Sequence, residues 1–142
     1  MRLGVLTEPE GENRVAIVPN SVKKLAKFGF EVVVESGAGR LAGHSDAEYE
    51  SIGAAVVTRD EAIAAPLIIA IALPDVNELT AGQTVACVAD PFRNPEVVRD
   101  CLSAGITLLS MDMIPRRLSR AQSMDVNSSQ DNLAGYKAVL LG

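Results

Sequence analysis

Short apolar runs alternate with amphipathic segments along most of the chain, which is the pattern of successive β-α-β units. One run, LIIAIAL at 67–73, is almost wholly apolar, as expected for a strand that is buried on both faces of a parallel sheet. The pattern predicts strands at Arg2–Leu6, Phe30–Glu35, 54–58, 67–73, 84–90 and 106–112, and a short extended segment at Arg14–Val18.

Amphipathic segments with helical spacing separate these runs. Pro19 opens the first predicted helix and Gly29 is its stop signal. Its apolar residues cluster on one side: Val22, Leu25, Ala26 and Phe28. Further helices are predicted at 46–53, 59–65 and 94–104, and in LAGYKAVLLG at the end of the sequence. Because right-handed crossovers stack helices on both faces of such a sheet, we expect an α/β fold with an open, mostly parallel, doubly wound sheet, Rossmann-like or flavodoxin-like.

The net charge, the lengths of the apolar runs and the scarcity of histidine limit the classes of function that suit this chain. The net charge of −5 argues against nucleic acid as a partner, because binding to phosphate backbones draws on clustered Lys and Arg. No apolar run approaches the roughly 20 residues that cross a bilayer. We therefore expect a soluble, cytoplasmic chain without direct membrane insertion. His44 is the only histidine, and Cys87 and Cys101 have no histidine companion, so the sequence predicts no catalytic acid, base or nucleophile and no metal site.

A glycine-rich turn invites a nucleotide-binding interpretation. Gly37, Gly39 and Gly43 follow a predicted strand with the spacing GxGxxxG, close to the dinucleotide fingerprint. That mechanism needs the later glycines at the start of a helix, whereas the best capping residues, Ser45 and Asp46, come after them. We favour a plain strand-to-helix turn in which glycines supply positive φ angles, with the phosphate cradle as the alternative.

From Asp112 the chain becomes polar, and the segment from Arg116 to Tyr136 concentrates arginines, serines, Gln122, Asp125 and Asn127. Such segments are often only solvated connections. The functional alternative is a ligand-binding loop, because Gln, Asp and Ser offer donors and acceptors that suit a neutral carboxamide, and an arginine binds a phosphate or a ring face.

Two stretches of this segment, RLSRAQSMD and SSQDNLAGYKAV, closely resemble the signature loop of the NAD(H)-binding alpha subunits of proton-translocating NAD(P) transhydrogenases. Four others, MRLGVL, ENRVAIVP, VKKLAKFGFEVVVESGAG and MDMIPR, resemble the amino-terminal domain that these subunits share with alanine dehydrogenases. The resemblance implies that residues 1–142 form this domain, with a cofactor-facing loop at 115–132. It also implies that a Rossmann NAD-binding domain follows in the family, so we expect a fragment that alone binds NAD poorly and is inactive.

The resemblance implies cofactor contacts at Gln122, Asp125 and Ser128. The arginine of the motif maps to Arg117 when counted back from Gln122 and to Arg116 when counted forward from Pro115; we prefer Arg117. The implied cofactors are NAD(H) here and NADP(H) on a partner. The implied assembly is a homodimer bound to NADP-binding and membrane-spanning components, peripheral to the inner face of the membrane.

Two other functions stay open. An alanine-dehydrogenase-like enzyme is favoured by Arg14 in ENRVA, because that family binds its keto acid with an arginine, a lysine and a histidine. Ala70 stands where the lysine is expected and Asp90 where the histidine is expected, so this site is incomplete. Direct transfer of hydride between nicotinamide rings needs positioning rather than an acid or base, which agrees with a chain poor in histidine. A non-catalytic assembly module is the third alternative.

Overall fold

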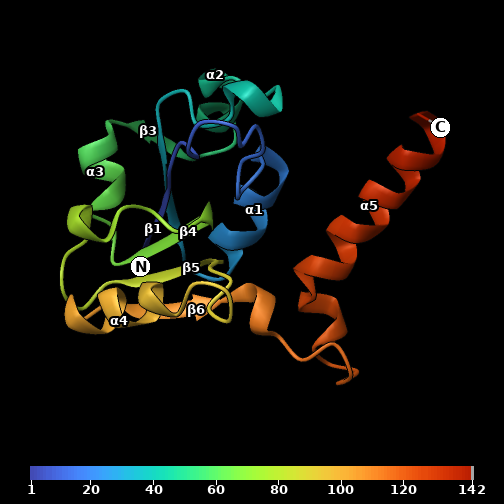
Figure 1. The fold of residues 1–142 in the computed structure, drawn as a ribbon. Coiled ribbons are helices and arrows are strands. Elements are labelled where there is room, and N and C mark those ends of the chain that lie inside the picture. Colours follow the sequence, from blue (N-terminus) through green and yellow to red (C-terminus); the bar gives the residue numbers. More distant parts are fainter. Residues whose placement is uncertain (142) are drawn as a thin grey trace.

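The structure, a computed structural model, describes residues 1–141 and is built on one sheet of six parallel strands (Figure 1). The order of the strands across the sheet is β3-β2-β1-β4-β5-β6. The strands are β1 (Arg2–Val5), β2 (Glu31–Glu35), β3 (Ala55–Val57), β4 (Leu67–Ala72), β5 (Thr84–Val88) and β6 (Thr107–Ser110). The chain thus winds outward from the centre in two directions, which confirms the predicted doubly wound α/β fold and fixes it as Rossmann-like.

Five α-helices and four short 3₁₀ helices connect or follow the strands within the described residues. The α-helices are α1 (Pro19–Lys27), α2 (Asp46–Ser51), α3 (Arg59–Ile63), α4 (Pro95–Ser103) and α5 (Val126–Leu141). The 3₁₀ helices are η1 (Arg40–Ala42), η2 (Val76–Glu78), η3 (Met111–Met113) and η4 (Gln122–Met124). Ser45 and Thr58 cap α2 and α3 through capping boxes with Glu48 and Glu61.

Two hydrophobic cores lie on opposite faces of the sheet, because successive strand side chains point to opposite faces. One face packs Leu3 and Val5 of β1 against α1 and α2. The other face packs Leu6 and the buried residues of β4 and β5, such as Ile68 and Val85, against α3 and α4. Strand β1 and helix α3 lie in close contact at Gly4, where a Cβ would lie 2.3 Å from the carbonyl oxygen of Ala62.

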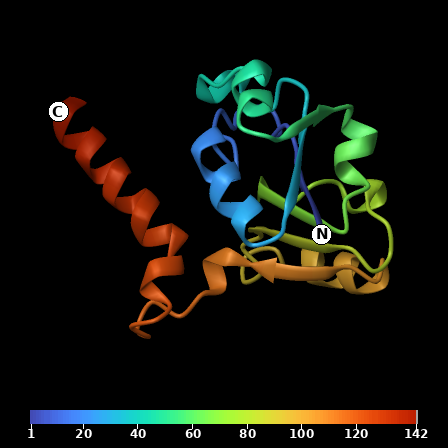
Figure 2. The ribbon, with the colours of Figure 1, turned by 180° about the vertical axis from the view of Figure 1, so that it is seen from behind.

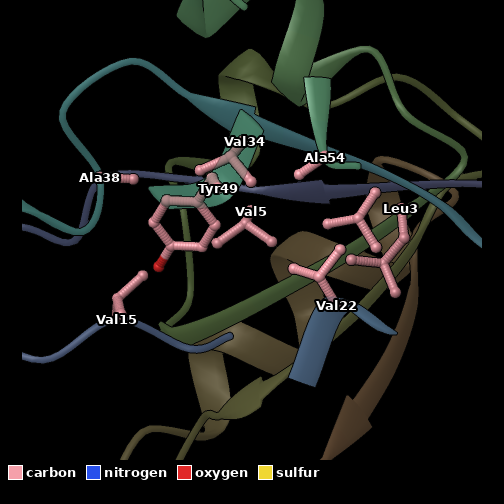
Figure 3. Packing of buried hydrophobic residues seen from close by; sticks show 9 residues of the cluster. Leu3, Val5, Val15, Val22, Val34, Ala38, Tyr49 and Ala54 are labelled. Carbon is pink, nitrogen blue, oxygen red and sulfur yellow. The ribbon is translucent and has the colours of Figure 1, made fainter. Parts of the chain in front are cut away.

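Tyr49 of α2 is the largest fully buried side chain. Figure 3 shows its ring against Val5, Val34 and Ala38, with the hydroxyl pointing toward the loop that carries Val15. The hydroxyl donates to the carbonyl oxygen of Ile17 at 2.8 Å, and burial raises the pKa of Tyr49 to about 12. The Tyr49 hydroxyl thereby fixes the loop that carries Ile17, which has no regular secondary structure.

Residues 14–18, predicted as a short extended segment, belong to none of the six strands of the sheet. A prediction for the first helix is wrong. In α1, Val22 is buried but Phe28 is 80% exposed and Ala26 is also exposed. Phe28 is the C-cap residue of α1, so it lies past the last regular turn, where helical spacing no longer sets which way a side chain points.

The segment after β6 leaves the body of the molecule. Figures 1 and 2, which view the chain from opposite sides, both show α5 projecting away from the sheet, with its end far from the strands. Its contacts to the rest of the chain are mainly with η3. The helix begins at Val126, well before the predicted LAGYKAVLLG, and the last residue of that stretch lies outside the described part.

Candidate functional site

The glycine-rich turn is a structural corner. Gly37 and Gly43 have φ of 83°, and α2 begins only after them, which confirms the turn predicted from the capping residues. Gly39 serves a different purpose, because its φ is ordinary and a Cβ there would lie 2.7 Å from the ring of Tyr49. The Gly37 amide donates to the carboxylate of Asp46 at 2.8 Å. A carboxylate of the chain therefore already engages an amide of this turn.

The topological switch point lies between β1 and β4, where sheets of this order usually bind their ligands. Here it is filled by Glu8, which is 9% exposed and whose two carboxylate oxygens accept the amides of Ile71 and Ala72 at 2.6 and 3.0 Å. Burial raises the pKa of Glu8, although both amides oppose that rise. The adjoining cavity of about 290 Å³ is also lined by Glu35, Asp75 and Arg59. Because the Arg59 guanidinium is already paired with Glu35 and Glu78, the remaining acids disfavour a phosphate there.

The same arrangement recurs along this edge of the sheet. The amide of Thr7, after β1, donates to Glu35 at 2.8 Å. After β5, the amides of Ala89 and Asp90 donate to Asp112 at 3.2 and 3.1 Å. Burial alone would raise the pKa of Asp112. Hydrogen bonds from the Ser110 hydroxyl and from backbone amides outweigh burial, so the pKa lies below its ordinary value. The amides that could cradle a phosphate at this edge are thus engaged by the chain's own carboxylates.

The predicted cofactor loop, 115–132, leads from η3 into the first turns of α5. Asp125, which is 7% exposed, precedes α5 and accepts the backbone amide of Ser128 at 2.9 Å and its hydroxyl at 2.5 Å. The Ser128 hydroxyl and amide lower the pKa of Asp125. The structure therefore brings two of the four predicted residues together, as a cap that satisfies free amides at the start of the helix.

The other two predicted residues do not meet this pair. Gln122 is exposed in η4, and Arg117 is exposed and makes no ion pair or side-chain hydrogen bond within residues 1–141. The neighbouring Arg116 instead lies near the cap, with Nε 3.8 Å from the carboxylate of Asp125 and Nη2 3.7 Å from that of Asp131. Arg116 thus has a place in the fold, while Arg117 and Gln122 present free polar groups to solvent.

A cavity of about 380 Å³ lies beside this loop, at the carboxyl ends of β4 and β5. Its walls are mostly apolar and include Ala70, where the alanine dehydrogenase pattern has a lysine. Arg14 is its charged residue, and the guanidinium is engaged on two sides, by Glu12 and by Gln130 of α5. Hydrogen bonding to Arg14 lowers the pKa of Glu12 to about 2, so this acid stays ionised beside the arginine.

Among the described residues that line this cavity, the thiol is inert. Cys87 lines the wall, but burial raises the pKa of its thiol to about 12, which leaves it protonated and unreactive at neutral pH. Asp90 has a φ of 45° and lies in a separate groove of about 530 Å³, with Asp112, Arg116 and Asn127. Among residues 1–141, no group of three or more His, Cys, Asp or Glu side chains is arranged to hold a metal ion.

Sequence reasoning missed two residues of this region. Asp112 joins the ends of β5 and β6, and Gln130 holds Arg14. The first carried a weak signal, since an acid at the end of a predicted strand often binds backbone amides. The second carried none, because its partner lies 116 positions away.

Comparison with known proteins agrees with this description. The profile of the family described as "Alanine dehydrogenase/PNT, N-terminal domain" matches residues 4–134. The NAD(P) transhydrogenase subunit alpha of Cereibacter sphaeroides is 41% identical over 146 residues, which covers 99% of this chain and 28% of that protein. The crystal structure of transhydrogenase from Sinorhizobium meliloti superposes with a TM-score of 0.93 at 42% identity, covering 99% of this chain and 43% of the other. An L-alanine dehydrogenase structure superposes with a TM-score of 0.78 at 25% identity, covering 85% and 34%.

The fold and these matches define an α/β domain of Rossmann-like architecture. More particularly, the chain belongs to the alanine dehydrogenase/PNT N-terminal domain family, and it is similar to the alpha subunits of NAD(P) transhydrogenases. It spans less than half the length of these relatives. Among the described residues, none of the helices has the length and apolarity to cross a membrane.

Proposed function

We propose that this chain acts within a proton-translocating NAD(P) transhydrogenase, where its loop 115–132 positions NAD(H) for direct hydride transfer to NADP(H) on a partner component. The observation that carries the proposal is the loop itself. Its exposed Gln122 and Arg117 extend from a segment whose far end is fixed by the Asp125–Ser128 cap. Bound NAD(H) would supply the hydride, and the residues of this chain would orient it.

The residues fit that task. A Gln amide both donates and accepts, as recognition of a carboxamide requires, and the fixed carboxylate and hydroxyl of the cap offer further polar groups nearby. Transfer of hydride between two nicotinamides exchanges no proton with the protein, so orientation of the two rings supplies most of the rate acceleration. The lack of a free acid, base or reactive thiol beside the cavity is therefore compatible with the reaction.

The carboxylates along the sheet edge support a second part of the proposal. Glu8, Asp46 and Asp112 occupy the amides that would otherwise hold a pyrophosphate. The phosphates of NAD(H) are then bound by another domain of the subunit, and this chain forms one wall of the cleft. We further propose that the subunit is a homodimer, and that NADP-binding and membrane-spanning components hold it at the inner face of the membrane.

The alternative activity, oxidation of alanine, needs an anion-binding arginine and acid–base groups. Arg14 is engaged by Glu12 and Gln130, and Ala70 lines the wall of the cavity. Both observations favour transhydrogenation. Alanine-dependent reduction of NAD without NADP by the complete protein would reverse this preference.

The test is steady-state transhydrogenation by the complete subunit reconstituted with its NADP-binding partner. Gln122→Ala, Arg117→Ala and Asp125→Asn should each lower turnover by about tenfold or more, because misplacement of reacting groups by ~1 Å can cost on the order of 100-fold. Arg40→Ala is the matched control, since Arg40 is exposed and belongs to the distant turn η1. Wild-type turnover in all three loop variants would refute the assignment.

A further inference from the structure

The loop 115–132 is joined to the sheet body by a contact that crosses most of the chain. Arg14 Nη1 donates to Gln130 Oε1 at 2.8 Å, across 116 positions of sequence. Gln130 lies in the first turns of α5, shortly after the capping pair Asp125 and Ser128. A displacement of Gln130 therefore moves the cap with it, because a helical turn behaves as one rigid unit.

The arginine that makes this contact is itself held in place. Its Nε donates to Glu12 Oε1 at 2.8 Å, and its own backbone amide donates to the same oxygen at 2.9 Å. Nη2 donates to the other oxygen of Glu12, which completes a bidentate pair. A planar guanidinium fixed along one edge presents its remaining N–H groups in a defined direction, toward α5.

The middle of the loop has no comparable attachment. Within the described residues, no side chain from 117 to 124 donates to or accepts from the sheet body. A second anchor lies close to the first, where Asn127 Nδ2 donates to the carbonyl oxygen of Asp112 at 3.3 Å. The side-chain hydrogen bonds of Gln130 and Asn127 that join the loop region to the sheet body thus lie near the start of α5.

We infer that Arg14 is a positioning residue. Glu12 holds its guanidinium, which in turn donates to Gln130. This contact fixes the first turns of α5 and the Asp125–Ser128 cap at the end of the cofactor loop. This inference rests on the proposed function, in which that loop orients NAD(H). It also gives Arg14 a role that differs from keto-acid binding. The guanidinium that would meet a substrate carboxylate is engaged by two groups of the chain.

The physical test is hydrogen–deuterium exchange of the complete protein. Arg14→Met and Gln130→Met each remove the contact while keeping a long side chain. Each should speed exchange of the amides at 127–135 by about tenfold and leave β5 unchanged, because loss of a hydrogen bond loosens its own region first. The double variant should exchange no faster than either single variant, since both remove one contact. Arg99→Met is the control, because within residues 1–141 the guanidinium of Arg99 in α4 pairs with Glu96 alone, at 3.9 Å.

The kinetic test is turnover in the reconstituted complex. Both single variants should lower kcat about five- to tenfold and change KM for NADH less than twofold, because a misplaced loop affects orientation more than binding. Arg14→Lys should recover part of the loss, since an ammonium still donates to Gln130 but cannot also hold both oxygens of Glu12. A purely structural role would lower the melting temperature without this separation of kcat from KM.

The outcomes separate the two proposals. Unchanged exchange at 127–135 in both single variants, or additive effects in the double variant, would overturn the inference. Faster exchange with unaltered kcat would also overturn it, because the loop would then move without consequence for hydride transfer. If the wild-type complex transfers no hydride, the proposed function fails, while the exchange experiment still decides whether Arg14 fixes α5.

Discussion

Strand residues such as Leu3 and Val85 are fully buried in the sheet, whereas every residue of α5 from Ser128 to Leu141 is exposed. The sheet body keeps its polar atoms paired, and Tyr49 and Glu8 show this where a buried hydroxyl or carboxylate meets backbone groups. In α5 the apolar side chains of Leu133, Val139 and Leu140 face solvent. The comparison teaches that stability resides in the sheet body, while the segment 115–141 carries groups available for recognition.

The largest effect is expected where the sheet body allows no added atom. Gly4→Ala would place a Cβ 2.3 Å from the backbone oxygen of Ala62 and 3.1 Å from the Cβ of Ala65. Because α3 cannot move without breaking its packing on β1, we expect a loss of about 3 kcal/mol or more in the free energy of unfolding. Urea denaturation followed by circular dichroism measures it.

Gly135→Ala is the matched variant in α5. Nothing lies within 4 Å of the added Cβ, and alanine favours a helix over glycine by about 0.5–1 kcal/mol. The free energy of unfolding should therefore be unchanged or slightly higher than in the wild type. Comparable losses in the two variants would contradict the division of the molecule into a sheet body and a projecting segment.

The next effect concerns the switch point. Glu8→Gln would set an NH₂ group against one of two amides that now donate to the carboxylate, at Ile71 or Ala72. An unpaired buried donor costs about 1–3 kcal/mol, and chemical denaturation at pH 7 measures it. Glu10→Gln is the control, because Glu10 is exposed.

The same variant has a signature in pH. Because the folded pKa of Glu8 lies above its ordinary value of 4.5, the native state binds more protons than the unfolded state between the two values. The contribution of Glu8 to stability is therefore largest below 4.5 and falls as the pH rises through the folded pKa. Glu8→Gln should remove this decline, and identical pH profiles for the variant and the wild type would contradict the assignment.

The smallest effect should come from α5. Val139 is 82% exposed, so Val139→Ala should change the free energy of unfolding by no more than about 0.5 kcal/mol. Val85→Ala in β5 removes the same two methyl groups from a fully buried site and should cost about 2 kcal/mol. Thermal denaturation of both variants compares the two regions directly, and a large loss at Val139 would show that α5 packs on the body in solution.

The sheet could be predicted from the sequence because each strand is a short apolar run and the helices between them carry local capping signals, as at Ser45 and Thr58. Residues 14–18 are rich in β-branched side chains but lie outside the sheet, where the Tyr49 hydroxyl donates to the carbonyl oxygen of Ile17. The error in α1 arose where local pattern does not decide structure. Phe28 follows the helical spacing of α1 but lies past its last turn.

The candidate site was harder to predict. The resemblance indicated Asp125 and Ser128, and the structure shows that they form a helix cap, which residue types alone did not reveal. The start of α5 was missed because VNSSQDN is polar and weak in helix propensity, so only the cap marks it. The binding of cofactor by Arg117 and Gln122 stays a prediction. Gln130 could not be found from sequence, since its contact with Arg14 depends on the fold.

The carboxylates at the ends of β2, β4 and β5 have a consequence for protein engineering. The backbone amides at this edge, which could otherwise bind an anion from solution, donate instead to Asp46, Glu8 and Asp112. Abundant free nucleotides such as ATP should therefore not compete for this edge, and the domain would fold without any of them. A designer who wished to install a phosphate site here would have to remove the acids first, and glycines alone would not suffice.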